Sequence, residues 1–257
     1  MDRVHRIILD TDLSMGVPRS NVDDGLALAL AVAHPEISLE LVTTVHGNTD
    51  VETATRLTTD LLAVLQRPDL RVVRGAGSAG AAPSAAAEAI VELVMGSPGG
   101  ITLVPIGPLT NIAAALTREP RVAGAVREVV LMGGSYFGTG NRRGLPGEFN
   151  VWSDPEAASQ VFSCGAPVRA VGLDVTLQVR LTREDTAALR RSGRTFGVLA
   201  ADAANSTLPS AAVQPPASIT ITIASTSASV AVTRSFMRRF SALRWRRWKP
   251  GVSTKIN

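Results

Sequence analysis

The chain has 257 residues, of which 45% are hydrophobic, 4% aromatic and 19% charged. This composition predicts a globular protein whose core is built mainly from aliphatic side chains, and it argues against a disordered or fibrous protein. The single cysteine excludes an internal disulfide, and no apolar run reaches the ~20 residues that a membrane-spanning helix needs. Because the N-terminus also lacks a signal-like apolar segment, we expect a cytoplasmic protein without a membrane partner.

Charge divides the chain into two unequal parts. All 22 acidic residues lie at or before Asp202, and residues 1–202 also hold 18 of the 26 basic ones, for a net charge of −4. Residues 203–257 contain eight basic residues and no acid. We therefore expect an α/β domain over 1–202 and an atypical basic tail over 203–257. A basic tail can bind nucleic acid or an anionic membrane surface, but we favour neither role for this one. Nucleic acid is not the partner that we favour.

Short apolar runs alternate with longer amphipathic ones along the first 200 residues. Strands are predicted at 6–10, 39–45, 71–74, 101–106, 128–132 and 168–171. Helices are predicted at 24–34, 51–66, 84–95, 109–117, 154–162 and 182–191. Ser84 and Asp154 have the side chains of helix N-caps, and Pro155 suits a first helical position. The alternation predicts an open, mainly parallel α/β sheet with helices on both faces, in which ligands bind beyond the carboxyl ends of the strands.

Four aspartates surround the first predicted strand end. Asp10 and Asp12 end the strand, and Asp23 and Asp24 begin the next helix. Packed carboxylates repel one another and need a cation or a shared proton, and oxygen ligands suit Ca²⁺ or Mg²⁺. The alternative is that the helix pair only complements the helix dipole and the strand pair is solvated. Two pairs flanking one loop favour the metal site.

Other strand ends contribute further polar groups. They are His46-Gly47-Asn48, the segment from Gly107 to Asn111, a glycine-rich loop that closes with Glu148-Phe149-Asn150, and Asp174 with Thr176. At one sheet edge, such groups suit a small, hydroxyl-rich ligand such as a sugar.

These segments, in this order across about residues 5–180, resemble the inosine–uridine-type nucleoside hydrolases. The matching motifs are Asp10-Thr11-Asp12 with Asp23-Asp24, 43–48 (TTVHGN), 103–111 (LVPIGPLTN), 131–134 (LMGG), 148–150 (EFN) with 154–158 (DPEAA), and 172–176 (GLDVT). The resemblance implies a Rossmann-like nucleoside hydrolase fold and hydrolysis of a ribonucleoside to ribose and free base by a Ca²⁺-bound water. It also implies a homo-oligomer.

The resemblance also implies roles for individual residues. Asp12, Asp24 and the backbone carbonyl of Ile106 would bind Ca²⁺, and Asp12 would also be the base that takes a proton from the attacking water. Asp23 and Asn150 would bind the 2′- and 3′-hydroxyls of the ribose, and Glu148 and Asn141 would bind its 5′-hydroxyl. Asn48 would line the ribose pocket, and Asp10 would support the calcium ligands without touching the ion.

Two features depart from the family pattern. Ten residues separate Asp12 from Asp23, where relatives commonly have a shorter loop. The family also carries a late His-Asp pair, as a metal ligand and a group beside the leaving base, whereas this chain has only His5, His34 and His46 and no His-Asp pair. We interpret 203–257 as a stretch translated out of frame or a replaced terminus. If the tail is real, we expect weak calcium binding and low or no activity.

Three alternatives follow from the same residues. The first is a degenerate member of the fold that binds nucleosides or ribose without turnover. The second is a haloacid dehalogenase-like phosphatase, suggested by Asp10 and Asp12, although its later lysine is missing before Lys249. The third is a dinucleotide site at the G-x-G-x-x-G of residues 75–80, which lacks the acidic residue expected ~20 residues further on. Base preference cannot be predicted from these residues.

Overall fold

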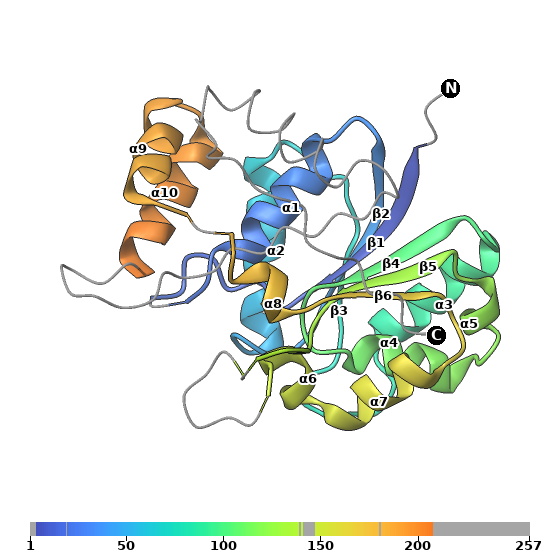
Figure 1. The fold of residues 1–257 in the computed structure, drawn as a ribbon. Coiled ribbons are helices and arrows are strands. Elements are labelled where there is room, and N and C mark those ends of the chain that lie inside the picture. The colour runs from blue at the N-terminus through green and yellow to red at the C-terminus, as the bar shows by residue number, and fades with distance from the viewer. Residues whose placement is uncertain (1–3, 19, 139, 141–146, 180, 208–257) are drawn as a thin grey trace.

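The computed structural model describes residues 4–18, 20–138, 140, 147–179 and 181–207 (Figure 1). Most of the predicted basic tail, together with the predicted site residue Asn141, lies outside these residues. No helix within the described ranges combines the length and the apolar character needed to cross a membrane.

A six-stranded sheet forms the centre of the fold, and all of its neighbouring strands are parallel. Its strands are β1 (His5–Thr11), β2 (Ile37–Thr44), β3 (Val72–Arg74), β4 (Ile101–Pro105), β5 (Glu128–Met132) and β6 (Val168–Val171). The order across the sheet is β3-β2-β1-β4-β5-β6. The chain adds β2 and β3 on one side of β1 and then β4, β5 and β6 on the other side, so the order switches between β1 and β4. In open α/β sheets, ligands bind at this switch point. The predicted open, parallel α/β architecture is confirmed.

Helices cover both faces of the sheet (Figure 1). One core cluster joins the sheet to α1 (Asp23–Ala33), α2 (Val51–Val64), α9 (Arg183–Arg191) and α10 (Thr195–Thr207). The other joins it to α3 (Ala85–Gly96), α4 (Thr110–Arg118), α5 (Val122–Ala125) and α7 (Pro155–Ser163). Side chains alternate between the two cores along β1, because successive strand residues point to opposite faces: Ile7 and Leu9 enter the first core, and Ile8 enters the second.

Local sequence signals explain several helix starts. The side chain of Ser84 accepts a hydrogen bond from the backbone N–H of Ala87, and that of Asp154 accepts one from Ala157, as their predicted N-cap roles require. Pro155 occupies the first turn of α7. Thr182 and Asp185 form a reciprocal capping box at the start of α9.

Four helices were not predicted. The helices α5, α6 (Phe149–Ser153) and α8 (Leu173–Thr176) have only four or five residues, which is too short to display a 3.6-residue period. The longer α10 packs against α9, and it needs Gly197 to do so, because a Cβ atom there would lie 2.6 Å from the carbonyl oxygen of Leu189. The last helix continues to Thr207, five residues beyond the predicted boundary at 202.

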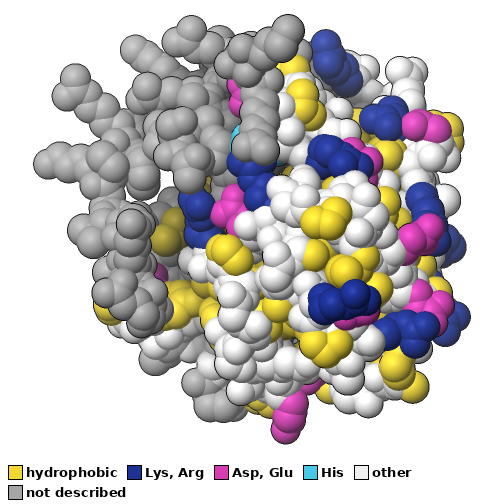
Figure 2. Space-filling view, turned by 90° about the vertical axis from the view of Figure 1, so that its right-hand side faces the viewer, with side chains coloured by type: hydrophobic (Ala, Val, Ile, Leu, Met, Phe, Trp, Pro, Cys, Tyr) yellow, Lys and Arg dark blue, Asp and Glu magenta, His cyan; other side chains and the backbone are white. Residues whose placement is uncertain are grey.

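The surface carries interspersed charges of both signs. Figure 2 shows arginine side chains beside acidic ones on the face turned toward the viewer. Exposed ion pairs of this kind include Arg121 with Glu119 at 2.7 Å and Arg169 with Glu128 at 2.9 Å. The described residues seen from this side therefore form no single-sign patch of the type that attracts nucleic acid.

Candidate active site

The end of β1 places two aspartates at the switch point of the sheet. Asp10 and Asp12 are both fully buried. Oδ1 of Asp10 accepts hydrogen bonds from Thr43 Oγ1 at 2.5 Å and from Asn111 Nδ2 at 2.8 Å, whereas its Oδ2 is buried without a partner. Burial outweighs these two hydrogen bonds and raises the pKa of Asp10 to about 7.

Asp12 lies between two loops that approach it closely. Its Oδ2 accepts a hydrogen bond from the backbone N–H of Asn48 at 2.7 Å, and its buried Oδ1 has no partner. A Cβ atom on Gly47 would lie 2.1 Å from Oδ2, and one on Gly107 would lie 3.1 Å from Oδ1. Both loops therefore need glycine beside this carboxylate. Burial raises the pKa of Asp12, and the nearby charge of Asp24 raises it further.

The first turn of α1 brings two more carboxylates to this place. Asp24 is buried, and its Oδ1 accepts a hydrogen bond from Thr11 Oγ1 at 2.5 Å, which ties α1 to the end of β1. Oδ1 of Asp23 is buried without a hydrogen-bond partner. Burial raises the pKa of both groups, and the charge of Asp24 adds to the rise for Asp23. The structure thus brings Asp12, Asp23 and Asp24 close enough for their charges to interact.

The end of β4 contributes the backbone of Ile106. Its N–H donates to the carbonyl of Asp10 at 2.8 Å, and its carbonyl accepts from Asn150 Nδ2 at 2.9 Å. The same amide nitrogen also reaches the carbonyl of Met132 at 3.2 Å. Because both hydrogens of the Asn150 amide are directed at backbone carbonyls, its Oδ1 is the atom left for a ligand hydroxyl.

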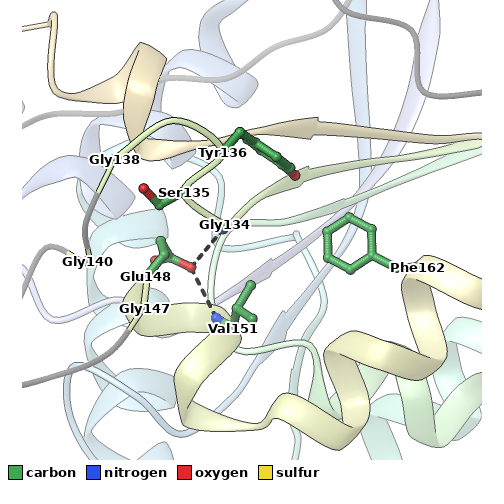
Figure 3. A pocket seen from close by; sticks show the side chains of 9 residues that line it. All are labelled: Gly134, Ser135, Tyr136, Gly138, Gly140, Gly147, Glu148, Val151 and Phe162. Carbon is green, nitrogen blue, oxygen red and sulfur yellow. Dashed lines mark hydrogen bonds between the residues drawn. The ribbon is translucent and has the colours of Figure 1, made fainter.

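Glu148 begins α6 and borders a pocket of about 280 Å³ (Figure 3). Its carboxylate accepts hydrogen bonds from the backbone N–H groups of Asn150, Val151 and Gly134, at 2.9, 3.0 and 3.1 Å. These bonds lower the pKa of Glu148, but burial has the larger effect and raises it. Figure 3 shows Tyr136 and Phe162 on the opposite side of this pocket.

Asn111 was not predicted as a site residue, yet it connects the segments that hold Asp10. It is fully buried, and its amide oxygen accepts from the backbone N–H of Ala76 at 2.9 Å and from Ser84 Oγ at 3.2 Å. Its amide nitrogen donates to Asp10 and, at 2.9 Å, to the carbonyl of Thr44. The sequence signal was present, because Asn111 lies in one of the strand-end motifs, but a turn role explains such an asparagine equally well.

A second buried network was also missed. The hydroxyl of Thr110 donates to Asp154 Oδ2 at 2.7 Å and lies 3.0 Å from Nε2 of His46. Because the single hydroxyl proton goes to the carboxylate, Nε2 of His46 must carry the proton of its own bond to Thr110. Burial lowers the pKa of His46, which favours the neutral ring. This network ties the His46-Gly47-Asn48 turn, which contacts Asp12, to α4 and α7.

The glycines of residues 75–80 serve packing in this fold. A Cβ atom on Gly75 would lie 2.3 Å from the Asn111 side chain and from the carbonyl of Thr44. Gly80 has a φ of +62°, in the left-handed region that glycine adopts readily. Two of the three glycines of the G-x-G-x-x-G are therefore explained without a dinucleotide, and Gly77 has only an ordinary contact with Val51.

Comparison with known proteins agrees with this geometry. The family model described as "Inosine-uridine preferring nucleoside hydrolase" matches residues 7–238. The chain belongs to this family. The pyrimidine-specific ribonucleoside hydrolase RihB of Escherichia coli (strain SE11) is 36% identical over 232 residues, covering 79% of this chain and 70% of RihB.

Solved structures of the nucleoside hydrolase family share the fold. The plant nucleoside hydrolase PpNRh1 superposes with a TM-score of 0.71 at 30% identity, covering 79% of this chain and 70% of that one. The purine-preferring ribonucleoside hydrolase of Gardnerella vaginalis gives the same TM-score and identity, with 79% and 71% covered. One relative is named for pyrimidines and another for purines, so membership of the family leaves the preferred base open.

Proposed function

We propose that this nucleoside hydrolase family member cleaves the N-glycosidic bond of ribonucleosides and releases ribose and the free base. The observation that carries the proposal is a group of buried carboxylates at the switch point of the sheet with oxygens that have no hydrogen-bond partner: Oδ1 of Asp12 and Oδ1 of Asp23. Such atoms are costly in a folded protein unless a ligand satisfies them.

The donor set fits a hard divalent cation, and we propose calcium. Among the described residues, no three or more His, Cys, Asp and Glu side chains are grouped so that they could hold a metal ion by themselves. The proposed ligands are those that the family resemblance implies: the carboxylates of Asp12 and Asp24 and the backbone carbonyl of Ile106. All three donors are oxygens, which Ca²⁺ prefers. Bound calcium would orient a water molecule and lower its pKa.

The other steps of the reaction are assigned to side chains of this protein. In this proposal Asp12, whose Oδ2 is held by the backbone N–H of Asn48, also takes the proton from the attacking water. Negative charge on the aspartates stabilises the positive charge that develops on the sugar ring as the bond breaks. Asp23, Asn150 and Glu148 are placed in this proposal at the ribose hydroxyls. Asn48 would line the ribose site, and Asp10, held by Thr43 and Asn111, would support Ile106 through its backbone carbonyl.

A second candidate function is binding of ribose or nucleosides without turnover. The observation that favours it is the absence of a His-Asp pair from the sequence, since the leaving base must be protonated or otherwise stabilised. Both functions use the same pocket and differ only in whether the bond breaks.

The test uses the full chain with calcium and three substrates: inosine, uridine and a chromogenic riboside. Release of reducing sugar is measured for the wild type, for Asp12→Asn and for a control, Asp69→Asn, which removes an exposed carboxylate paired with Arg67. Loss of a general base should slow release on the order of 10²- to 10⁴-fold in Asp12→Asn, with no change in Asp69→Asn. Calorimetry on the same proteins measures binding.

Three results discriminate between the candidates. Release that needs Asp12 supports the hydrolase. Saturable nucleoside binding without sugar release supports the binding protein. Neither binding nor release with any of the three compounds refutes both.

A further inference from the structure

The loop between Asp12 and α1 (dark blue in Figure 1) is longer than in the family pattern, yet part of it is buried. Leu13, Ser14, Met15 and Val22 are all buried. Two turns shape the loop, with the N–H of Val17 donating to the carbonyl of Ser14 at 2.9 Å and that of Ser20 to the carbonyl of Val17 at 3.1 Å. The hydroxyls of Ser20 and Ser14 are also hydrogen-bonded. The described part of the loop before α1 is therefore held by hydrogen bonds and by buried side chains.

The side chain of Met15 reaches α1. It crosses the helix at Gly25, directly after the two helix aspartates, and a Cβ atom on Gly25 would lie 2.6 Å from its Sδ, 2.7 Å from its Cε and 3.2 Å from its Cβ. Met15 is 5% exposed and belongs to the core cluster that includes Leu26 and Leu28. The two contacts under 3 Å come from the tip of Met15, and because that tip is buried in the core it has little space to rotate away from an added methyl group.

Packing rather than capping holds the start of α1, because residues 24–31 are buried. Val22 occupies the N-cap position, and no side chain there accepts a hydrogen bond from the helix. Thr11 holds Asp24 by one hydrogen bond, whereas Oδ1 of Asp23 has no hydrogen-bond partner. An uncapped helix end frays unless tertiary packing holds it.

We propose that the contact between Met15 and Gly25 is a positioning contact that seats the first turn of α1, with Asp23 and Asp24, against Asp12. The inference rests on the proposed function in one respect, that these carboxylates serve a calcium site. Met15 and Gly25 act through the aspartates and touch neither ion nor sugar. The longer loop thus supplies the methionine, and the helix supplies the glycine against which it packs.

The test is a cycle of four proteins: wild type, Met15→Ala, Gly25→Ala and Met15→Ala/Gly25→Ala. Alanine favours a helix more than glycine does, so Gly25→Ala should stabilise the protein wherever there is room for the methyl group. We expect it to destabilise the wild-type background and to stabilise the Met15→Ala background. Gly124→Ala in α5 is the matched control, because no atom lies within 4 Å of its Cβ position.

Two measurements on these proteins separate positioning from packing. Calcium affinity by calorimetry should fall on the order of ten- to one-hundredfold in Gly25→Ala, as for residues that orient metal ligands, and should largely recover in the double variant. Amide hydrogen exchange over residues 13–24, measured without calcium, should rise in Gly25→Ala and return toward the Met15→Ala level in the double variant.

Each outcome decides the inference. Unchanged exchange in Gly25→Ala, or equal effects of that substitution in both backgrounds, overturns the contact. Faster exchange with unchanged calcium affinity shows that the contact only packs the loop, and overturns positioning. A wild type that binds no calcium refutes the calcium site of the proposed function, and hydrogen exchange then decides the steric fit alone.

Discussion

Asn111→Ala removes a buried side chain that satisfies four groups on separate segments. The backbone N–H of Ala76, the carbonyl of Thr44 and Oδ1 of Asp10 lose a partner, while the hydroxyl of Ser84 can turn elsewhere. Asp10 keeps its bond to Thr43, so two backbone groups bear most of the effect. A buried polar group without a partner costs about 1–3 kcal/mol, so we expect a loss of about 2–6 kcal/mol in the free energy of unfolding.

A loss of this size is a large part of the about 5–15 kcal/mol that stabilises a typical domain. Urea unfolding of the calcium-free protein, followed by circular dichroism, measures it as a lower midpoint at unchanged slope. The control is Gln160→Ala, which removes an exposed amide bonded to Thr117 at 2.8 Å and should change stability by less than about 0.5 kcal/mol. A loss of under about 1 kcal/mol in Asn111→Ala would refute the reasoning, because it would mean that these groups find water or other partners.

Three further predictions concern the same region. Gly47→Ala places a methyl group against Asp12 Oδ2 and should abolish calcium binding in calorimetry, while a protein that binds normally would show that the turn can move. In the calcium-free protein, the pKa of Asp10 is raised to about 7, so the folded state binds more protons than the unfolded state between about pH 4 and pH 7, and the melting temperature should fall as pH rises through this window. Because burial also raises the pKa of Asp12, Asp23 and Asp24, Asp10→Asn should make the fall less steep without abolishing it, and an unchanged slope would contradict the assignment. Thr110→Val leaves Asp154 Oδ2 without its 2.7 Å donor and should lower the unfolding free energy by about 1–3 kcal/mol in urea, whereas Thr117→Val, at an exposed helix position, serves as the control.

The sequence determined which segments become strands and helices where the signal is local. Buried aliphatic runs specified the six strands, and two of them, β5 and β6, have the predicted ends. Ser84, Asp154 and Pro155 marked helix starts because a cap satisfies backbone groups within its own turn. The motifs at the strand ends were sufficient to predict the family, because both their residues and their order can be read directly from the chain.

Tertiary structure alone decided which side chains support one another. Asn111 and Asp10 are 101 residues apart, and Thr110 and Asp154 are 44 apart, so no periodicity or spacing could pair them. The fit of Met15 against Gly25 depends on the path of an irregular loop, which has no sequence period. Local preferences act within one turn or one strand, whereas these contacts exist only after the sheet has brought distant segments together and excluded water from between them.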